Sequence, residues 1–144
     1  MTMQISKKAD YALRAMAILA ALPPDRTMQA QELADSGKIP IKFLEQILLV
    51  LKRADFLRSK RGVGGGYRLA RESRLISVAD VIEAVDGELL RFLDSSDYPD
   101  FPGASGIVEC LGKAEDATNT QLRGTSIEDL IRQDVGDAMV GYGI

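Results

Sequence analysis

The part of the sequence best suited to chemistry is a basic, glycine-rich segment that runs from Lys52 to Arg71. Four glycines lie within Arg61–Tyr67, and because glycine has no side chain, the backbone of this loop can approach a partner closely. Only Asp55 and Glu72 oppose the charge of the flanking cations, which are Lys52, Arg53, Arg58, Lys60, Arg61, Arg68, Arg71 and Arg74. A basic hairpin with a bare tip is suited to a phosphate backbone and a narrow groove.

Glycine-rich loops also cradle phosphates in nucleotide-binding proteins. The dinucleotide-binding fingerprint would require glycine where Tyr67 stands, and a helix should follow. A P-loop would require Lys followed by Ser or Thr where this chain has Arg68-Leu69. Both nucleotide-binding interpretations therefore fail, which leaves a DNA-binding loop or a flexible hairpin tip with incidental charge.

Two short helices are expected immediately before the basic segment. The first covers Thr27–Ser36 and ends at Gly37 as a left-handed cap. After the connection Lys38-Ile39-Pro40, the second begins at about Ile41. Its apolar residues follow the spacing of one helix face, at Leu44, Ile47, Leu48 and Leu51. Two helices joined by such a turn make a helix-turn-helix, whose second helix enters the major groove of DNA.

The glycine-rich loop follows this helix pair between two short predicted strands, Phe56–Lys60 and Tyr67–Ala70. A helix-turn-helix followed by a β-hairpin is the winged-helix arrangement, with the loop as its wing. The first turn and a half of the second helix would reach base edges, through Lys42, Phe43, Glu45 and Gln46. Gln can pair with adenine, Glu can accept from cytosine N4, and Lys favours guanine or phosphate. Phe43 either touches a thymine methyl or belongs to the core.

The remaining elements are expected to be helical. A helix over Lys7–Leu22, N-capped by Ser6 and ended by Pro23-Pro24, is apolar around most of its circumference, which a subunit interface would explain. A capping box at Ser77–Asp80 opens a helix to Val85, which is stopped at Gly87. A loop over Asp94–Gly106 leads to an amphipathic helix over Ile107–Leu122. The last elements are a helix capped by Ser126, which runs to about Val135, and a loose tail over Gly136–Ile144.

Composition restricts the class of protein. The chain has 144 residues, of which 46% are apolar and 27% charged, enough to bury a core. No apolar stretch approaches the ~18 residues of a membrane span, no segment resembles a signal peptide, and a single cysteine fits a reducing cytoplasm. The absence of histidine closes the commonest catalytic routes. We therefore expect a cytoplasmic protein that is neither a membrane protein nor an enzyme.

Charge is segregated along the chain. Through Leu75 there are 14 Lys/Arg and 7 Asp/Glu, a net charge of +7, and from Ile76 onward there are 4 and 14, a net charge of −10, which together give −3. This asymmetry indicates an anion-binding front and a C-terminal half with another task, and ordinary fluctuation in charge is the alternative.

With these elements in place, the sequence resembles the Rrf2 family of bacterial transcription regulators. The likeness covers nearly the whole chain and is carried by Ser6–Met16, Phe43–Leu48, Arg58–Ala70, Val78–Ile82 and Thr125–Ile131. It implies a homodimer joined through the helix Ile107–Leu122, with support from the first helix. It also implies an imperfect palindrome as the DNA site, with recognition helices in major grooves and wings in minor grooves.

The resemblance also assigns roles to residues. Glu45 would read bases, Arg61 and Gly62 would form the minor-groove tip, and three further contact positions are Pro40, Lys42 and Phe43. The full predicted DNA-binding set is Pro40, Lys42, Phe43, Glu45, Gln46, Lys52, Arg53, Arg58, Ser59, Lys60, Arg61, Gly62, Val63 and Gly64. The predicted dimer interface is Ile107, Leu111, Ala114, Thr118 and Leu122.

The sequence departs from the family pattern in two places. Pro40 and Lys42 stand where members often carry hydroxyl residues that bond DNA, so the preferred operator would differ. Many members ligate an iron–sulfur cluster through three closely spaced cysteines in the loop before the long helix, whereas Leu89–Gly106 contains none and Cys110 lies beyond it. We therefore expect no cofactor and no metal site. Cys110 of two subunits is the alternative candidate for a cluster or a redox role.

The sequence thus predicts a mainly α fold with a small β-hairpin. Its parts are a winged helix-turn-helix DNA-binding domain over 1–87, a sensor-type loop over 88–106, a dimerisation helix and final capping helix over 107–135, and a tail over 136–144. The predicted function is a sequence-specific transcriptional regulator, a repressor that binds double-stranded DNA as a homodimer. The alternatives are a protein-interaction module with vestigial DNA binding, whose acidic half docks a basic partner, and a redox- or iron–sulfur-responsive regulator using Cys110.

Overall fold

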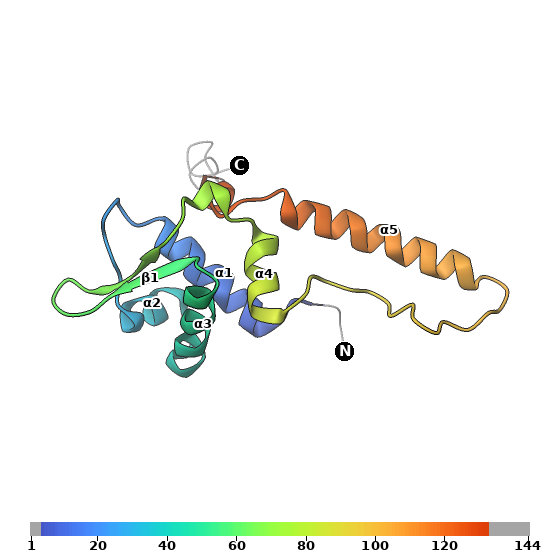
Figure 1. Ribbon diagram of the computed structural model, residues 1–144, viewed down its shortest axis with the longest axis horizontal. Coiled ribbons are helices and arrows are strands. Elements are labelled where there is room, and N and C mark those ends of the chain that lie inside the picture. Colours follow the sequence, from blue (N-terminus) through green and yellow to red (C-terminus); the bar gives the residue numbers. More distant parts are fainter. Residues whose placement is uncertain (1–3, 133–144) are drawn as a thin grey trace, which may run out of the picture.

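The first helix lies at the centre of the fold. The computed structural model describes residues 4–132 (Figure 1). Helix α1 (Lys7–Ala20) contacts α2 (Ala30–Gly37), α3 (Ile41–Arg53), α4 (Val78–Asp86) and strand β2 (Gly66–Leu69). Its buried residues are Ala9, Ala12, Ala15, Met16 and Leu19. Contacts within the chain therefore bury much of its apolar surface, and the contribution of this helix to a subunit interface stays a prediction.

The ends of α1 and α2 show what local sequence does and does not determine. The predicted N-cap is confirmed, because Ser6 Oγ accepts a hydrogen bond from the Ala9 amide at 2.9 Å. Helix α2 begins at Ala30 rather than at Thr27. Met28 pairs there with Tyr67 of the distant hairpin, through amide-to-carbonyl bonds of 3.0 and 2.7 Å. The helix therefore begins later in the sequence than predicted, because Met28 is paired with a distant part of the chain.

The turn between α2 and α3 differs from the prediction. Gly37 is the last helical residue, and the left-handed position is Lys38, with φ at 53°. The left-handed cap predicted at Gly37 is therefore wrong by one residue. Glycine at 37 serves packing instead, because a Cβ there would lie 2.9 Å from Ile39 Cδ1 and 3.1 Å from Ile18 Cδ1. The absence of a Cβ at Gly37 makes room for the buried side chain of Ile39.

The helix-turn-helix and the hairpin form as the sequence predicts, except that the first strand starts one residue later and the second lies one residue earlier than expected. Helix α3 begins at Ile41, and its four predicted inward residues, Leu44, Ile47, Leu48 and Leu51, are all buried. Strands β1 (Leu57–Lys60) and β2 are antiparallel, with Leu57 opposite Leu69 and Lys60 opposite Gly66. A mainly helical fold with one small hairpin is thereby confirmed.

The chain returns to the core after the hairpin. A 3-10 turn, η1 (Ser73–Leu75), precedes α4, whose capping box between Ser77 and Asp80 is confirmed, as is Gly87 as its left-handed cap, with φ at 85°. A last helix over 127–132 begins with the same reciprocal bonds between Ser126 and Asp129. Its buried Ile127 donates to the carbonyl of Ile76 at 2.8 Å, which holds it to the core. The predicted end at Val135 and the tail over 136–144 lie outside the described residues.

Helix α5 (Ala104–Arg123) extends away from this core, together with the loop over 88–103 (Figure 1). It begins at Ala104 rather than at Ile107, directly after Gly103, whose φ of 98° turns the chain. Among residues 4–132, no helix is both long and apolar enough to cross a membrane. The proposed division into domains stays a prediction.

Candidate nucleic-acid interface

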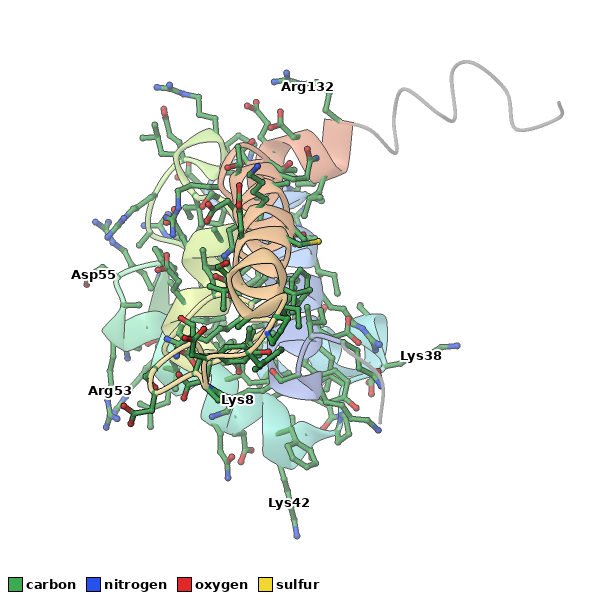
Figure 2. The ribbon with its side chains drawn as sticks, turned by 90° about the vertical axis from the view of Figure 1, so that its right-hand side faces the viewer. Lys8, Lys38, Lys42, Arg53, Asp55 and Arg132 are labelled. Atoms are coloured by element: carbon green, nitrogen blue, oxygen red, sulfur yellow. The ribbon has the colours of Figure 1, made fainter. Side chains whose placement is uncertain are left out.

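Helix α3 presents a polar face outside the core. The predicted readers Lys42, Glu45 and Gln46 are exposed, and Figure 2 shows Lys42 pointing away from the molecule. Phe43 is 56% exposed and its ring lies 6.2 Å from the ring of Tyr11, so it belongs to the surface rather than to the core. This surface can meet base edges and thymine methyl groups.

An arginine that the sequence prediction left out fixes the turn before α3. Arg14 on α1 pairs with Asp10 at 2.7 Å, and its Nη1 donates to the carbonyl of Gly37 at 3.0 Å. Its guanidinium also stacks on Tyr11, 5.1 Å from the ring centroid. Because Tyr11 contacts Phe43, Arg14 connects α1 to both the turn and α3. The four-residue spacing of Asp10 and Arg14 was visible in the sequence, but the hydrogen bond from Arg14 to the distant Gly37 carbonyl was not.

The wing ends in a tight glycine turn, and the hydroxyl of Thr27 is among the groups that bond to it. Thr27 Oγ1 donates to the carbonyls of Gly64 and Gly65, at 2.9 and 3.1 Å. A Cβ on Gly65 would lie 2.3 Å from the carbonyl oxygen of Lys60, and one on Gly66 would lie 2.6 Å from that of Met28. Glycine is therefore required sterically at both positions. Only a backbone this bare folds so closely against its neighbours.

The tip of the wing is fully available to a partner. Arg61, Gly62, Val63 and Gly64 are exposed, and nothing lies within 4 Å of a Cβ built on Gly62 or Gly64. Both glycines have positive φ, 89° and 74°, which side chains rarely adopt. The tip therefore combines one cation with a thin backbone, a shape that enters a minor groove.

The other predicted cations surround the base of the wing. Lys52 Nζ donates to Ser59 Oγ at 2.6 Å, which links α3 to β1. Arg53, Arg58 and Lys60 are exposed. Figure 1 shows α3 and the wing at the end of the molecule away from the projecting end of α5. The structure thus brings the predicted DNA-binding residues together at one end, and their role stays a prediction.

Helix α5 is partly covered by its own loop. The Phe92 amide donates to Glu115 at 3.0 Å, and Asn119 Nδ2 donates to the carbonyl of Leu90 at 3.2 Å. In the same loop, Asp94 accepts hydrogen bonds from Ser96, and these lower the pKa of its carboxyl group. The bond from the Ser96 side chain has the larger effect, and the bond from the Ser96 amide the next. Of the predicted dimer stripe, Leu111, Thr118 and Leu122 are half-buried, whereas Ile107 and Ala114 are exposed.

Comparison with known proteins agrees with this arrangement. Residues 5–133 match the family model of Rrf2, described as an iron-dependent transcriptional regulator. The chain belongs to the Rrf2 family. A protein named as an HTH-type transcriptional regulator in Mycobacterium tuberculosis is 34% identical over 130 residues, which span 89% of this chain and 81% of that protein. The resemblance inferred from the sequence is confirmed, and this Rrf2 protein is a transcriptional regulator rather than an enzyme.

Solved Rrf2 structures share the whole architecture. CymR, the global cysteine regulator of B. subtilis, has a TM-score of 0.78 and 27% identity, over 92% of this chain and 98% of that one. IscR of T. potens has a TM-score of 0.73 and 28% identity, over 92% and 88%. The winged-helix fold is thus that of Rrf2 regulators.

Within residues 4–132, the side chains of this Rrf2 chain do not fit the iron in the family's description. Cys110 is an exposed thiol on α5, and it is the chain's single cysteine. Across residues 4–132, no three His, Cys, Asp or Glu side chains gather as ligands for a metal ion. An iron–sulfur cluster is normally held by several thiolates. The described part of one copy therefore does not assemble the donor set of a cluster.

Proposed function

We propose that this Rrf2 protein binds an imperfect DNA palindrome as a homodimer and represses transcription there. The observation that carries the proposal is the pairing, at one end of the molecule, of an exposed polar face on α3 with a glycine wing fixed by Thr27. An α-helix fits the major groove, and a thin basic loop fits the minor groove beside it.

A dimer would form along the exposed side of α5. Ile107 is 39% exposed there, next in the stripe to Leu111 and Ala114. Covering an apolar side chain on this projecting helix with a second copy removes it from water, which is favourable. Two copies related by a twofold axis would present two recognition helices to two half-sites. Repression would follow because a dimer on such a site blocks RNA polymerase.

The test is selection of DNA from a library of random duplexes, followed by transcription from a promoter that carries the selected sequence. We expect enrichment of an inverted repeat whose half-sites are centred ~10 bp apart or a multiple of that. We also expect less transcript when the protein is added. Enrichment of a single unrepeated site would contradict the dimer, and more transcript would contradict repression.

We further propose that the protein acts without an iron–sulfur cluster. Support comes from the single thiol, Cys110, and from the lack of a ligand group across residues 4–132. Anaerobically purified protein is therefore expected to show no absorption band at about 400 nm and no stoichiometric iron. A band accompanied by iron, lost in Cys110→Ser, would instead establish a cluster with Cys110 as a ligand.

A further inference from the structure

The base of the wing borders a cavity whose lining includes residues outside the predicted DNA-binding set. It has a volume of about 440 Å³ and is lined by the cations Arg58, Lys60 and Arg68 together with Asp25, Thr27, Ser59 and Gly64. This volume lies within the ~300–1,000 Å³ of small-molecule sites. The segment before α2 forms one wall of the cavity, and the hairpin forms the other.

The three cations lie on one face of the hairpin. Side chains alternate along a strand, so Arg58 and Lys60 point away from the face on which Leu57 is buried and Ser59 meets Lys52. Arg68 is directly opposite Arg58 in the strand pairing. Like charges directly opposite each other destabilise a hairpin. An anion between them would remove this repulsion.

The charge on this face is largely unbalanced. Within residues 4–132, neither Arg58 nor Lys60 has a carboxylate in ion-pair distance, and Arg68 has only Asp25, at 3.6 Å. The Asp25 side chain is 96% exposed, so solvent screens this pair strongly. The cavity therefore keeps a net positive charge and presents two guanidinium groups, which suit the geometry of phosphate.

The cavity is also connected to the wing tip. Thr27, which lines it, donates its hydroxyl proton to the carbonyls of Gly64 and Gly65. Gly64 itself forms part of the cavity wall. An occupant of the cavity would therefore touch the residues that set the position of the tip.

We propose that this cavity, which adjoins the wing tip at Gly64, is a phosphate-binding pocket in which Arg58, Lys60 and Arg68 hold one phosphate group. The phosphate comes either from the DNA backbone beside the wing, which rests on the DNA binding proposed above, or from a free phosphate-bearing ligand. In both cases Arg68, which is not among the residues predicted to bind DNA, is a binding residue. Asp25 limits the affinity for the anion.

Two charge changes test the pocket in opposite directions. Arg68→Gln removes a cation, whereas Asp25→Asn removes the competing carboxylate at a position with φ of 64°, which Asn tolerates as Asp does. Arg132→Gln, at an exposed arginine in the last helix, controls for the loss of one surface charge. Inorganic pyrophosphate is the free probe, followed through the backbone amide signals of Thr27, Gly64 and Arg68, and the selected DNA duplex is the second probe.

For a free ligand, pyrophosphate should shift these signals saturably, with affinity reduced on the order of tenfold by Arg68→Gln and increased by Asp25→Asn. For a DNA phosphate, Arg68→Gln should lower the slope of log affinity against log salt by about one, while Arg132→Gln leaves it unchanged. The pocket is refuted if pyrophosphate produces no saturable shift and the salt slope of Arg68→Gln equals that of the wild type. Wild-type protein that binds no duplex would refute the proposed function instead, and the pyrophosphate result would still decide the pocket.

Discussion

Individual residues of the wing show that its glycines meet specific conformational and steric requirements, in addition to making the loop flexible. Gly62 and Gly64 adopt positive φ, while Gly65 and Gly66 leave no room for a Cβ. The sequence predicted a bare loop, because four glycines stand together. It did not reveal which glycines are sterically required, because the obstructing carbonyls belong to the turn itself and to Met28, far away in the sequence.

Arg61 is the residue through which the wing prediction can be tested. Replacing it with alanine removes the single cation at the tip, so we expect operator binding to weaken by ~1–3 kcal/mol while the dimer stays intact. The measurement is fluorescence anisotropy at fixed salt, with sedimentation to follow the dimer. Lys113→Ala on α5 is the matched control. Equal affinity of Arg61→Ala and wild type would rule out the wing as a groove contact.

Whole elements were predictable where the signal is local. The inward stripe of α3, the capping box at Ser77 and the cap at Ser126 each depend on a few neighbouring residues, and all appear as expected. Errors arose where distant segments meet. Helix α2 starts late because Met28 pairs with Tyr67, and Gly37 serves to accommodate Ile39 and Ile18 rather than as the left-handed cap.

The capping box of α4 is expected to contribute measurably to stability. Ser77 Oγ accepts from the Asp80 amide at 2.9 Å, and Asp80 accepts from the Ser77 amide at 2.9 Å. Ser77→Ala removes the first bond, so we expect the free energy of unfolding to fall by ~1 kcal/mol in urea titrations. Ser105→Ala, at an exposed site on α5, should change it by less than ~0.5 kcal/mol. Equal stabilities of the two variants would contradict the cap.

At the scale of the whole molecule, α5 and its loop extend away from the core (Figure 1). The segregated charge in the sequence indicated two parts with different tasks. The fold places the basic helix-turn-helix and wing at one end and leaves α5 projecting from the core. The sequence could not say which side of α5 its own loop covers, because that depends on two hydrogen bonds: Glu115 accepts from the Phe92 amide, and Asn119 donates to the Leu90 carbonyl.

Ile107 tests the proposed assembly. Ile107→Glu places a charge on the exposed apolar side of α5, and burying an unpaired charge is costly, so we expect a monomer. Sedimentation should report half the mass of the wild type, with an unchanged helical circular dichroism spectrum. Ser105→Glu, also exposed on α5, should remain dimeric. A dimeric Ile107→Glu protein would place the interface elsewhere.

The central proposal is that α3 and the wing bind DNA sequence-specifically. The most direct test measures the affinity of the protein for the selected palindrome and for a scrambled duplex of equal length, each at several salt concentrations. We predict tighter binding to the palindrome at every salt concentration. We also predict that log affinity falls linearly with log salt, by about 0.9 for each phosphate neutralised. Equal affinity for both duplexes, or an affinity that does not change with salt, would contradict the proposal.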